Sequence, residues 1–313
     1  MRRRARAGRT VGSALQGPRV QIYSGKSRET VQIPTVIPYV VWGALGLVFG
    51  SFLNVCIARL PKGESIIMPR SHCPRCGHLI RWYDNIPVLS YVFLGARCRD
   101  CRVKISPVYP LVELLTAGVW IAGFARYQLS PEFIKATVFN MLVLIVVFTD
   151  LLERCVPHAV TLSGMIAGLF FSFFAPMDPR AVGWLLARVG FFPGETVLSV
   201  LGAVAGALVG GGLFYVVGEI FYLASGRTKE YLGFGDVMLM LMVGFFLGPT
   251  LTLMTILLGS LGGTLIALPL TLASPRFRGY QWPYATFLGA AAVVTSLWGA
   301  PLLEAYLRWA GLA

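Results

Sequence analysis

Long apolar segments separated by short polar connections dominate this chain and restrict what it can fold into. A helix needs about 20 apolar residues to cross the hydrocarbon core of a bilayer. Of the 313 residues, 56% are hydrophobic and only 13% are charged, which excludes a soluble globular domain. We predict an all-α polytopic membrane protein of about eight transmembrane helices, at residues 36–58, 107–126, 133–148, 159–174, 197–224, 237–247, 251–271 and 284–302.

The sixth of these segments is too short to span a membrane unaided, and its merger with the seventh would change the topology. Gly248 and Pro249 lie between them, and this pair is typical of a break in a helix. In the fifth segment, Gly206 and residues 210–212 supply further glycines, a pattern that favours close packing between membrane helices. We therefore expect two separate helices around Gly248 and a tightly packed fifth helix.

The polar connection after the first segment carries four cysteines in two pairs, Cys73-Pro-Arg-Cys76 and Cys98-Arg-Asp-Cys101. Each pair places two thiolates on one tight turn, and two pairs complete a tetrahedral sulfur site of the kind that zinc prefers. Four thiolates leave no open coordination position, so the predicted zinc is structural. The alternative is a pair of disulfides or free thiols, and a reducing compartment disfavours the disulfides.

Basic residues set the predicted orientation and the domain boundaries. The connection at 59–104 holds nine Arg and Lys against three acids, which places it in the cytoplasm. The first 35 residues hold eight basic residues and one acid and favour the opposite orientation; we interpret them as a basic, disordered tail. The net charge of +13 is mostly this topology signal and does not indicate nucleic acid. The predicted domains are the tail at 1–35, a transmembrane helix at 36–58, a cytoplasmic zinc domain at 59–106 and a transmembrane core at 107–313.

Ionisable residues inside membrane segments are costly and are therefore candidates for function. Asp150 closes the apolar run that begins at Met141, and Asp236 ends the sequence Gly233-Phe-Gly235-Asp236, whose glycines permit close backbone packing. Both acids lie at the predicted cytoplasmic end. Two neighbouring carboxylates share a proton, so that one can activate water while the other donates a proton, as an aspartyl protease requires. Asp150 alone is equally consistent with a helix end that faces interfacial water.

The remaining membrane acids do not form such a pair. They are Glu113, Glu153 and Glu219. Glu113, early in the second segment, is either an interfacial acid or a third polar group near the site.

A set of motifs in fixed order connects these candidates. They are Gly50-Ser-Phe-Leu-Asn54, Ser71-His-Cys-Pro-Arg-Cys-Gly77, Trp82-Tyr-Asp-Asn-Ile-Pro87, Cys98-Arg-Asp-Cys101, Ile105-Ser-Pro-Val-Tyr-Pro-Leu-Val-Glu113, Asp150 and Gly233-Phe-Gly-Asp236. Over about residues 45–240 this set resembles the bacterial type IV prepilin peptidase family. The resemblance implies a multi-pass protein of the bacterial inner membrane, an aspartyl endopeptidase of the Gly-x-Gly-Asp type with Asp150 and Asp236 as its catalytic pair.

The resemblance also implies substrates and a second cofactor. The substrates are the leader peptides of type IV prepilins or type II secretion pseudopilins, cleaved after a glycine at the cytoplasmic face. Many members of the family then methylate the new amino terminus with S-adenosylmethionine. Two positions depart from the family pattern: His158 follows Pro157 where aspartate is common, and Met238 stands where lysine is frequent.

Two other classes of protein stay open at this stage. An ion-coupled transporter would also place Asp150 and Asp236 in the membrane, although such sites lie near the midplane. A zinc-bearing membrane scaffold of a secretion system would account for the four cysteines alone. That second class leaves the paired aspartates unexplained.

Overall fold

The computed structural model describes residues 36–178, 180–226, 233–277 and 280–311. The predicted basic tail at 1–35 lies outside these residues. Six of the described helices are long and apolar enough to cross a membrane, which confirms a polytopic all-α protein. They are α1 (Val36–Arg59), α3 (Val108–Tyr127), α4 (Pro131–Glu153), α7 (Glu195–Ala224), α8 (Phe234–Ala273) and α9 (Tyr284–Trp309).

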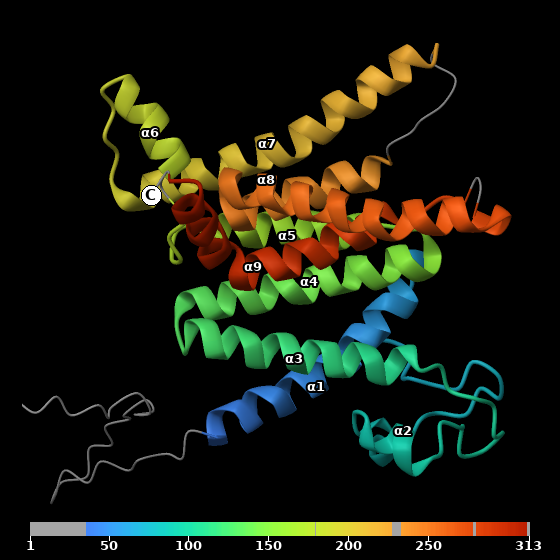
Figure 1. Cartoon of the computed structure of the whole chain (residues 1–313). Helices are drawn as coiled ribbons and strands as arrows, with labels where there is room; N and C mark the ends of the chain where they lie inside the picture. Colours follow the sequence, from blue (N-terminus) through green and yellow to red (C-terminus); the bar gives the residue numbers. More distant parts are fainter. Residues whose placement is uncertain (1–35, 179, 227–232, 278–279, 312–313) are drawn as a thin grey trace, which may run out of the picture.

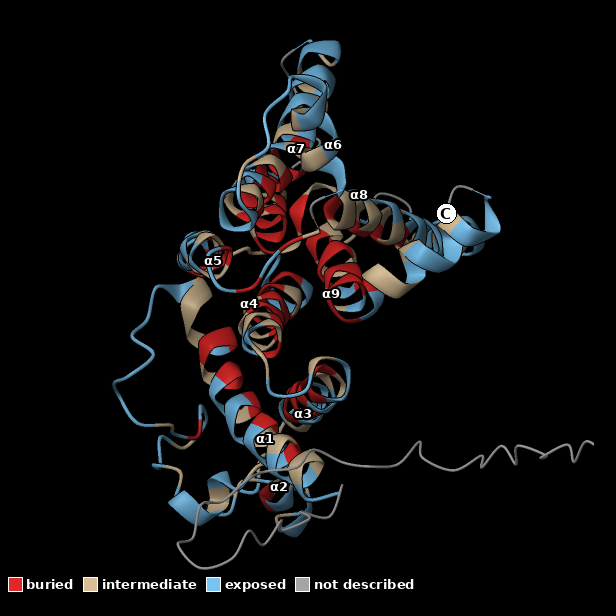
Figure 2. Cartoon of the chain, turned by 90° about the vertical axis from the view of Figure 1, so that its left-hand side faces the viewer, coloured by how far each residue is buried: buried red, intermediate tan, exposed pale blue. Residues whose placement is uncertain are grey.

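Helix α4 lies in the middle of the bundle. It contacts α3 and α1 on one side and α9, α5 and α8 on the other (Figures 1 and 2). Its inward face supplies Phe139, Val143 and Val146, which are almost completely buried. Because the buried residues face the other helices and the exposed apolar residues face outward (Figure 2), the exterior suits lipid rather than water.

Helix α8 reverses direction at Gly248, as the glycine–proline pair predicts. Gly248 has φ 75° and ψ 175° inside a segment of 40 residues, and Pro249 follows it. A Cβ added to Gly210 of α7 would lie 2.5 Å from the Met240 carbonyl oxygen and 2.8 Å from Thr252 Cγ2. In a straight helix those two residues would be roughly 18 Å apart. Residues 234–247 and 249–273 therefore form a helical hairpin against α7, which Figure 1 shows as two antiparallel rods.

Helix α5 (His158–Phe171) is shorter than the predicted segment at 159–174. Its 14 residues span roughly 21 Å, less than the hydrocarbon core of about 30 Å. The chain continues after Phe171 as turns, so α5 crosses only with the help of its neighbours α4, α7 and α8. Counting α5 and the two halves of α8 separately gives the predicted eight apolar helices.

Short helices occupy the connections. The amphipathic α6 (Arg180–Arg188) precedes α7, while the loop between α1 and α3 contains η1 (Leu60–Lys62), η2 (Trp82–Asn85) and α2 (Leu89–Phe93). A last short helix, η3 (Pro275–Phe277), precedes α9. One end of the bundle carries the loop between α1 and α3 (Figure 1). The same end carries the last residues of α1, α4 and α7 and the first residues of α3, α5, α8 and α9.

Candidate functional site

The four cysteines lie on two backbone turns of the same construction. In the first turn the Cys73 N–H donates to the His78 carbonyl at 2.9 Å, and in the second the Cys98 N–H donates to the Val103 carbonyl at 2.9 Å. Each turn closes with a left-handed residue four positions after its first cysteine, Gly77 at φ 72° and Arg102 at φ 58°. These turns present both sulfurs of a pair to the same side.

The two turns bring all four sulfurs together. The Sγ atoms of Cys73, Cys76, Cys98 and Cys101 lie within 4.8 Å of one another, and those of Cys73 and Cys101 are 3.7 Å apart. A tetrahedral Zn–S distance of about 2.3 Å corresponds to an edge of roughly 3.8 Å, so the cluster fits a closed tetrathiolate metal site. The backbone N–H of Cys76 lowers the pKa of the Cys73 thiol to about 6, whereas desolvation and the sulfurs of Cys73 and Cys101 raise the pKa of the Cys76 thiol to about 12, so a metal would have to displace a proton there on binding. All six cysteines are free thiols in this structure, and the 3.7 Å between the Cys73 and Cys101 sulfurs exceeds a disulfide bond, so of the two alternatives to a metal site only free thiols agree with it.

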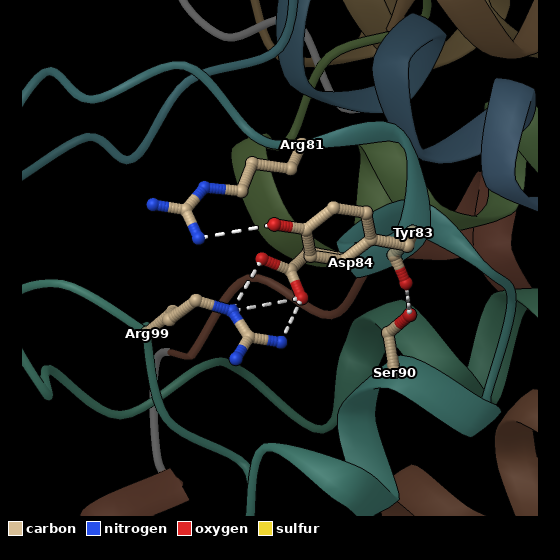
Figure 3. Close-up of polar contacts among 5 residues, drawn as sticks. All are labelled: Arg81, Tyr83, Asp84, Ser90 and Arg99. Atoms are coloured by element: carbon tan, nitrogen blue, oxygen red, sulfur yellow. Dashed lines mark hydrogen bonds and ion pairs between the residues drawn. The ribbon is translucent and has the colours of Figure 1, made fainter.

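A group of hydrogen bonds and one ion pair connects the second cysteine turn to the segment before α2 (Figure 3). The Arg99 guanidinium donates to both carboxylate oxygens of Asp84, at 2.5 to 3.2 Å, and lies over the Tyr83 ring. Arg81 donates to the Tyr83 hydroxyl at 3.0 Å, and Ser90 donates to the Tyr83 carbonyl at 2.9 Å. The hydrogen bonds from Arg99 lower the pKa of Asp84, so Arg99 and Asp84 form an ion pair at neutral pH.

Asp150 is buried at the end of α4 and is held by the start of α9. Its Oδ2 atom accepts hydrogen bonds from the Thr286 N–H at 2.7 Å and from the Thr286 hydroxyl at 2.8 Å. Thr286 is the third residue of α9, where backbone N–H groups have no partner within the helix. The sequence contained no signal for this contact, because 136 residues separate the two positions.

Asp236 lies in the first turn of α8 and is partly exposed. Gly233 is the residue before the helix, and its backbone hydrogen-bonds the Asp236 carboxylate. A Cβ added to Gly235 would lie 2.8 Å from Val156 Cβ, in the turn between α4 and α5. The glycine therefore lets the start of α8 approach the turn that follows Asp150, which is the close packing that the motif predicted.

The structure thus brings Asp150 and Asp236 together at one end of the bundle. Gly235, next to Asp236, packs against Val156 in the turn after α4, so the charges of the two carboxyl groups act on each other through space. Glu153 and Glu219 are exposed and lie outside this pair, and buried Glu113 instead contacts Ser51 and Val88. Two carboxyl groups on the same side of the bundle can act together on a water molecule between them.

Of the two positions that depart from the family pattern, His158 lies against the start of α8 that carries Asp236. The His158 ring is exposed at the start of α5 and packs edge-on against Phe234, with ring centroids 6.0 Å apart. Arg154, in the same turn, donates to the Tyr280 hydroxyl and lies 5.0 Å from that ring centroid. These contacts join the turn after α4 to the segment before α9, and sequence reasoning missed them.

A hollow opens where the four-cysteine loop meets the end of α1. Its volume is about 350 Å³, and Arg59, Arg70, Trp82 and Asn85 contribute polar and aromatic groups to its lining. Arg59 uses its guanidinium to bind the Ser65 and Pro69 carbonyl oxygens, at 2.8 and 2.7 Å, and so shapes the wall. This size lies at the lower end of the range for small-molecule sites.

Comparison with known proteins identifies the family. Residues 44–127 match the bacterial peptidase A24 N-terminal domain, and residues 137–268 match the type IV leader peptidase family. Proteins named prepilin leader peptidase/N-methyltransferase are similar over most of the chain. The one from Myxococcus xanthus is 39% identical over 74% of this chain and 63% of its own length, and the one from Pseudomonas aeruginosa is 30% identical over 85% and 92%.

A relative from Bacillus subtilis with the same name is 28% identical and is covered over 96% of its length. No solved structure matches the chain. The two matched models together cover the cysteine loop, both aspartates and the helices that carry them, so the chain belongs to the type IV leader peptidase family.

Proposed function

We propose that this protein is an aspartyl endopeptidase that removes the basic leader of type IV prepilins or type II secretion pseudopilins, with Asp150 and Asp236 as its catalytic pair. The observation that carries the proposal is the close packing of Gly235, beside Asp236, against Val156 in the turn after α4, which brings the two aspartates to the same end of the membrane bundle. Membership of the family and the names of the relatives agree with it.

The chemistry follows from two neighbouring carboxyl groups that hold one proton between them. The ionised group accepts a proton from water, and the resulting nucleophile attacks the carbonyl carbon of the scissile peptide. The protonated group donates to the carbonyl oxygen. Collapse of the tetrahedral intermediate breaks the C–N bond, and the proton taken from water passes to the leaving amine. Thr286 fixes the orientation of Asp150 through two hydrogen bonds, so the pair is positioned before substrate binds.

The depth of the pair suits the proposed substrate. A prepilin has a short basic leader followed by an apolar helix in the membrane, so its scissile bond lies at the cytoplasmic interface. Asp150 is three residues from the end of α4, and Asp236 is the third residue of α8. A transporter would instead place its acids near the midplane. We accordingly place the pair on the cytoplasmic side of the bacterial inner membrane.

The test is cleavage of a purified prepilin, followed by intact mass measurement. Asp150→Asn and Asp236→Asn should each abolish cleavage while the protein still inserts in the membrane. Glu153→Gln is the matched control, because it makes the same acid-to-amide change at an exposed position three residues from Asp150. Full cleavage by either aspartate variant would remove that residue from the mechanism.

The four cysteines are proposed to hold one zinc ion as a structural element. The sulfur spacing fits zinc, and the loop between α1 and α3 has few buried residues to stabilise it without a metal. The closed ligand set leaves no position for substrate, so the metal acts on the fold of the loop.

Methylation of the new amino terminus would require S-adenosylmethionine, which supplies an electrophilic methyl group when bound. We propose the hollow at the end of α1 as its site, because the Arg70 charge complements a carboxylate and the Trp82 ring can stack on adenine. Arg70→Ala should weaken binding of radiolabelled S-adenosylmethionine to the purified protein and leave leader cleavage unchanged. Unaltered binding would place the methyl donor elsewhere.

A further inference from the structure

Helix α2 presents an apolar face that no other part of the described chain covers. Leu89, Val92 and Phe93 lie at positions i, i+3 and i+4 and are 54%, 67% and 84% exposed, whereas Ser90 on the opposite side is buried. A cluster of large exposed apolar side chains on a polar loop indicates an interaction surface.

The position of α2 relative to the bundle identifies what this surface faces. Figure 1 shows α2 at the same level as the neighbouring end of α3, and Figure 2 shows it to the side of α1 and α3, outside the bundle. The surface is therefore beside the membrane-facing sides of α1 and α3. Those sides of α1 and α3 also carry exposed apolar residues, among them Val48 and Leu114, as lipid contact requires.

A hydrogen bond fixes the depth of the segment independently. The Val88 N–H donates to Glu113 Oε2 at 2.7 Å, and Glu113 is only 7% exposed. Glu113 is the sixth residue of α3, roughly 7.5 Å from the helix start along its axis. A Cβ added to Gly50 of α1 would lie 2.6 Å from Glu113 Cα, and one added to Gly46 would lie 2.6 Å from Ala117 Cα, so Glu113 belongs to the close contact between these two helices. The residue just before α2 is thus held within the first turns of the span.

The backbone N–H groups just before and at the start of α2 have hydrogen-bond partners, as apolar surroundings require. Val88 adopts φ 59° and ψ −48°, a conformation that is rare for a β-branched residue. Irregular backbone is tolerated at membrane depth only where its polar groups are paired. Pro87 has no N–H group, Glu113 accepts that of Val88, and the N–H groups of Leu89 and Ser90 donate to the Pro87 and Ile86 carbonyl oxygens.

The charge next to α2 also matches a membrane surface. Arg97, Arg102 and Lys104 follow the helix, and Arg102 and Lys104 are exposed without an ion pair among the residues that the structure describes. Basic groups beside an inserted apolar face bind the anionic headgroups of lipids.

We propose that α2 is an interfacial membrane anchor, with Leu89, Val92 and Phe93 inserted in the leaflet next to the four-cysteine loop and Glu113 holding the anchor at that depth. The anchor fixes the metal-binding loop against the bilayer between its two covalent connections to α1 and α3. This inference does not depend on the proposed proteolysis.

Spin labels on single cysteines test the proposal in lipid nanodiscs. The background retains the four metal-bound cysteines and replaces Cys56 and Cys155 with alanine, and metal content is checked in each variant. Labels are placed at Leu89→Cys, Val92→Cys and Phe93→Cys. Leu79→Cys on the first cysteine turn is the matched control, since Leu79 is 55% exposed and of the same residue type as Leu89.

We expect the labels on α2 to be more accessible to oxygen, which concentrates in lipid, than to a water-soluble nickel chelate, with the opposite order at position 79. Greater access to nickel at positions 92 and 93 would overturn the proposal. Low access to both reagents would also overturn it, because it would show that protein covers the face.

The role of Glu113 is tested in the Phe93→Cys background. Glu113→Leu removes the acceptor for the Val88 N–H, so the label at position 93 should shift towards nickel access. Glu113→Gln retains an acceptor oxygen of the same reach and should keep the label in lipid. An unchanged label in Glu113→Leu would refute the positioning role of Glu113.

Discussion

Substitution of Gly235 by alanine tests how closely the two aspartates must be placed. The new Cβ would lie 2.8 Å from Val156 Cβ and 3.0 Å from Val156 Cγ2, whereas ordinary contacts lie at 3.4–4 Å. The start of α8 or the turn after α4 must therefore move apart by roughly 1 Å. Each of these segments carries or adjoins one aspartate, so the movement separates the catalytic pair.

The expected loss follows from that displacement. A misplacement of about 1 Å in catalytic groups costs on the order of 10²-fold in rate. We expect kcat for leader cleavage to fall roughly 100-fold in Gly235→Ala, which corresponds to about 2.7 kcal/mol in the activation free energy. The assay is cleavage of a prepilin by the reconstituted protein, followed over time by intact mass.

Three further variants separate this explanation from a general effect of alanine. Gly233→Ala should lose little activity, because its nearest new contact would be Asp236 Oδ2 at an ordinary 3.6 Å. Gly212→Ala should be neutral, since nothing lies within 4 Å of its Cβ position. Val156→Gly in the Gly235→Ala background removes both clashing atoms and should recover at least about 10-fold. Wild-type cleavage by Gly235→Ala would refute the reasoning.

Other predictions concern the remaining parts of the site. Thr286→Val removes one of two hydrogen bonds to Asp150 and should lower kcat about 10-fold or more, while Thr286→Ser retains the hydroxyl and most of the rate. Cys73→Ser should lower metal content by elemental analysis and make the loop between α1 and α3 sensitive to limited proteolysis, with activity falling indirectly; active protein without metal would contradict the structural role. For topology, Val189→Cys, at a position that is 76% exposed, should react with a membrane-impermeant maleimide in intact cells and Glu64→Cys should not, in a background without Cys56 and Cys155. The reverse labelling would place the aspartates on the outer face, where a leader peptidase could not meet its substrate.

Sequence reasoning succeeded where a local pattern reports a physical requirement directly. Apolar length reports the thickness of the bilayer, so the segments at 36–58 and 197–224 differ from α1 and α7 by only one or two residues at their ends. Gly248 with Pro249 reports a position that a helix cannot continue through, and the hairpin in α8 turns there. The paired cysteines also predict the sulfur cluster, because each pair lies on one turn of neighbouring residues.

Sequence reasoning failed where the role of a residue depends on which residue of another helix it contacts. Gly206, Gly210 and Gly212 carry the same pattern in α7, but the first two are buried against α8 and nothing lies near the third. The sequence around Thr286 does not indicate its hydrogen bonds to Asp150, because they form only where α4 and α9 pack together. Val88 likewise gives no signal, because its left-handed conformation depends on Glu113, 25 positions further along the chain.

The helix ends around the two aspartates explain how a pair of acids is maintained at the edge of an apolar bundle. Asp236 lies in the first turn of α8, and Asp150, although it closes α4, is bound by the first turn of α9. Both carboxyl groups therefore lie at helix amino termini, where unpaired N–H groups and the helix dipole favour negative charge. The carboxyl end of α4 would by itself disfavour Asp150, so the contact with α9 offsets an unfavourable position. The proposed catalytic pair thus depends on three helices, α4, α8 and α9, of which only two carry an aspartate.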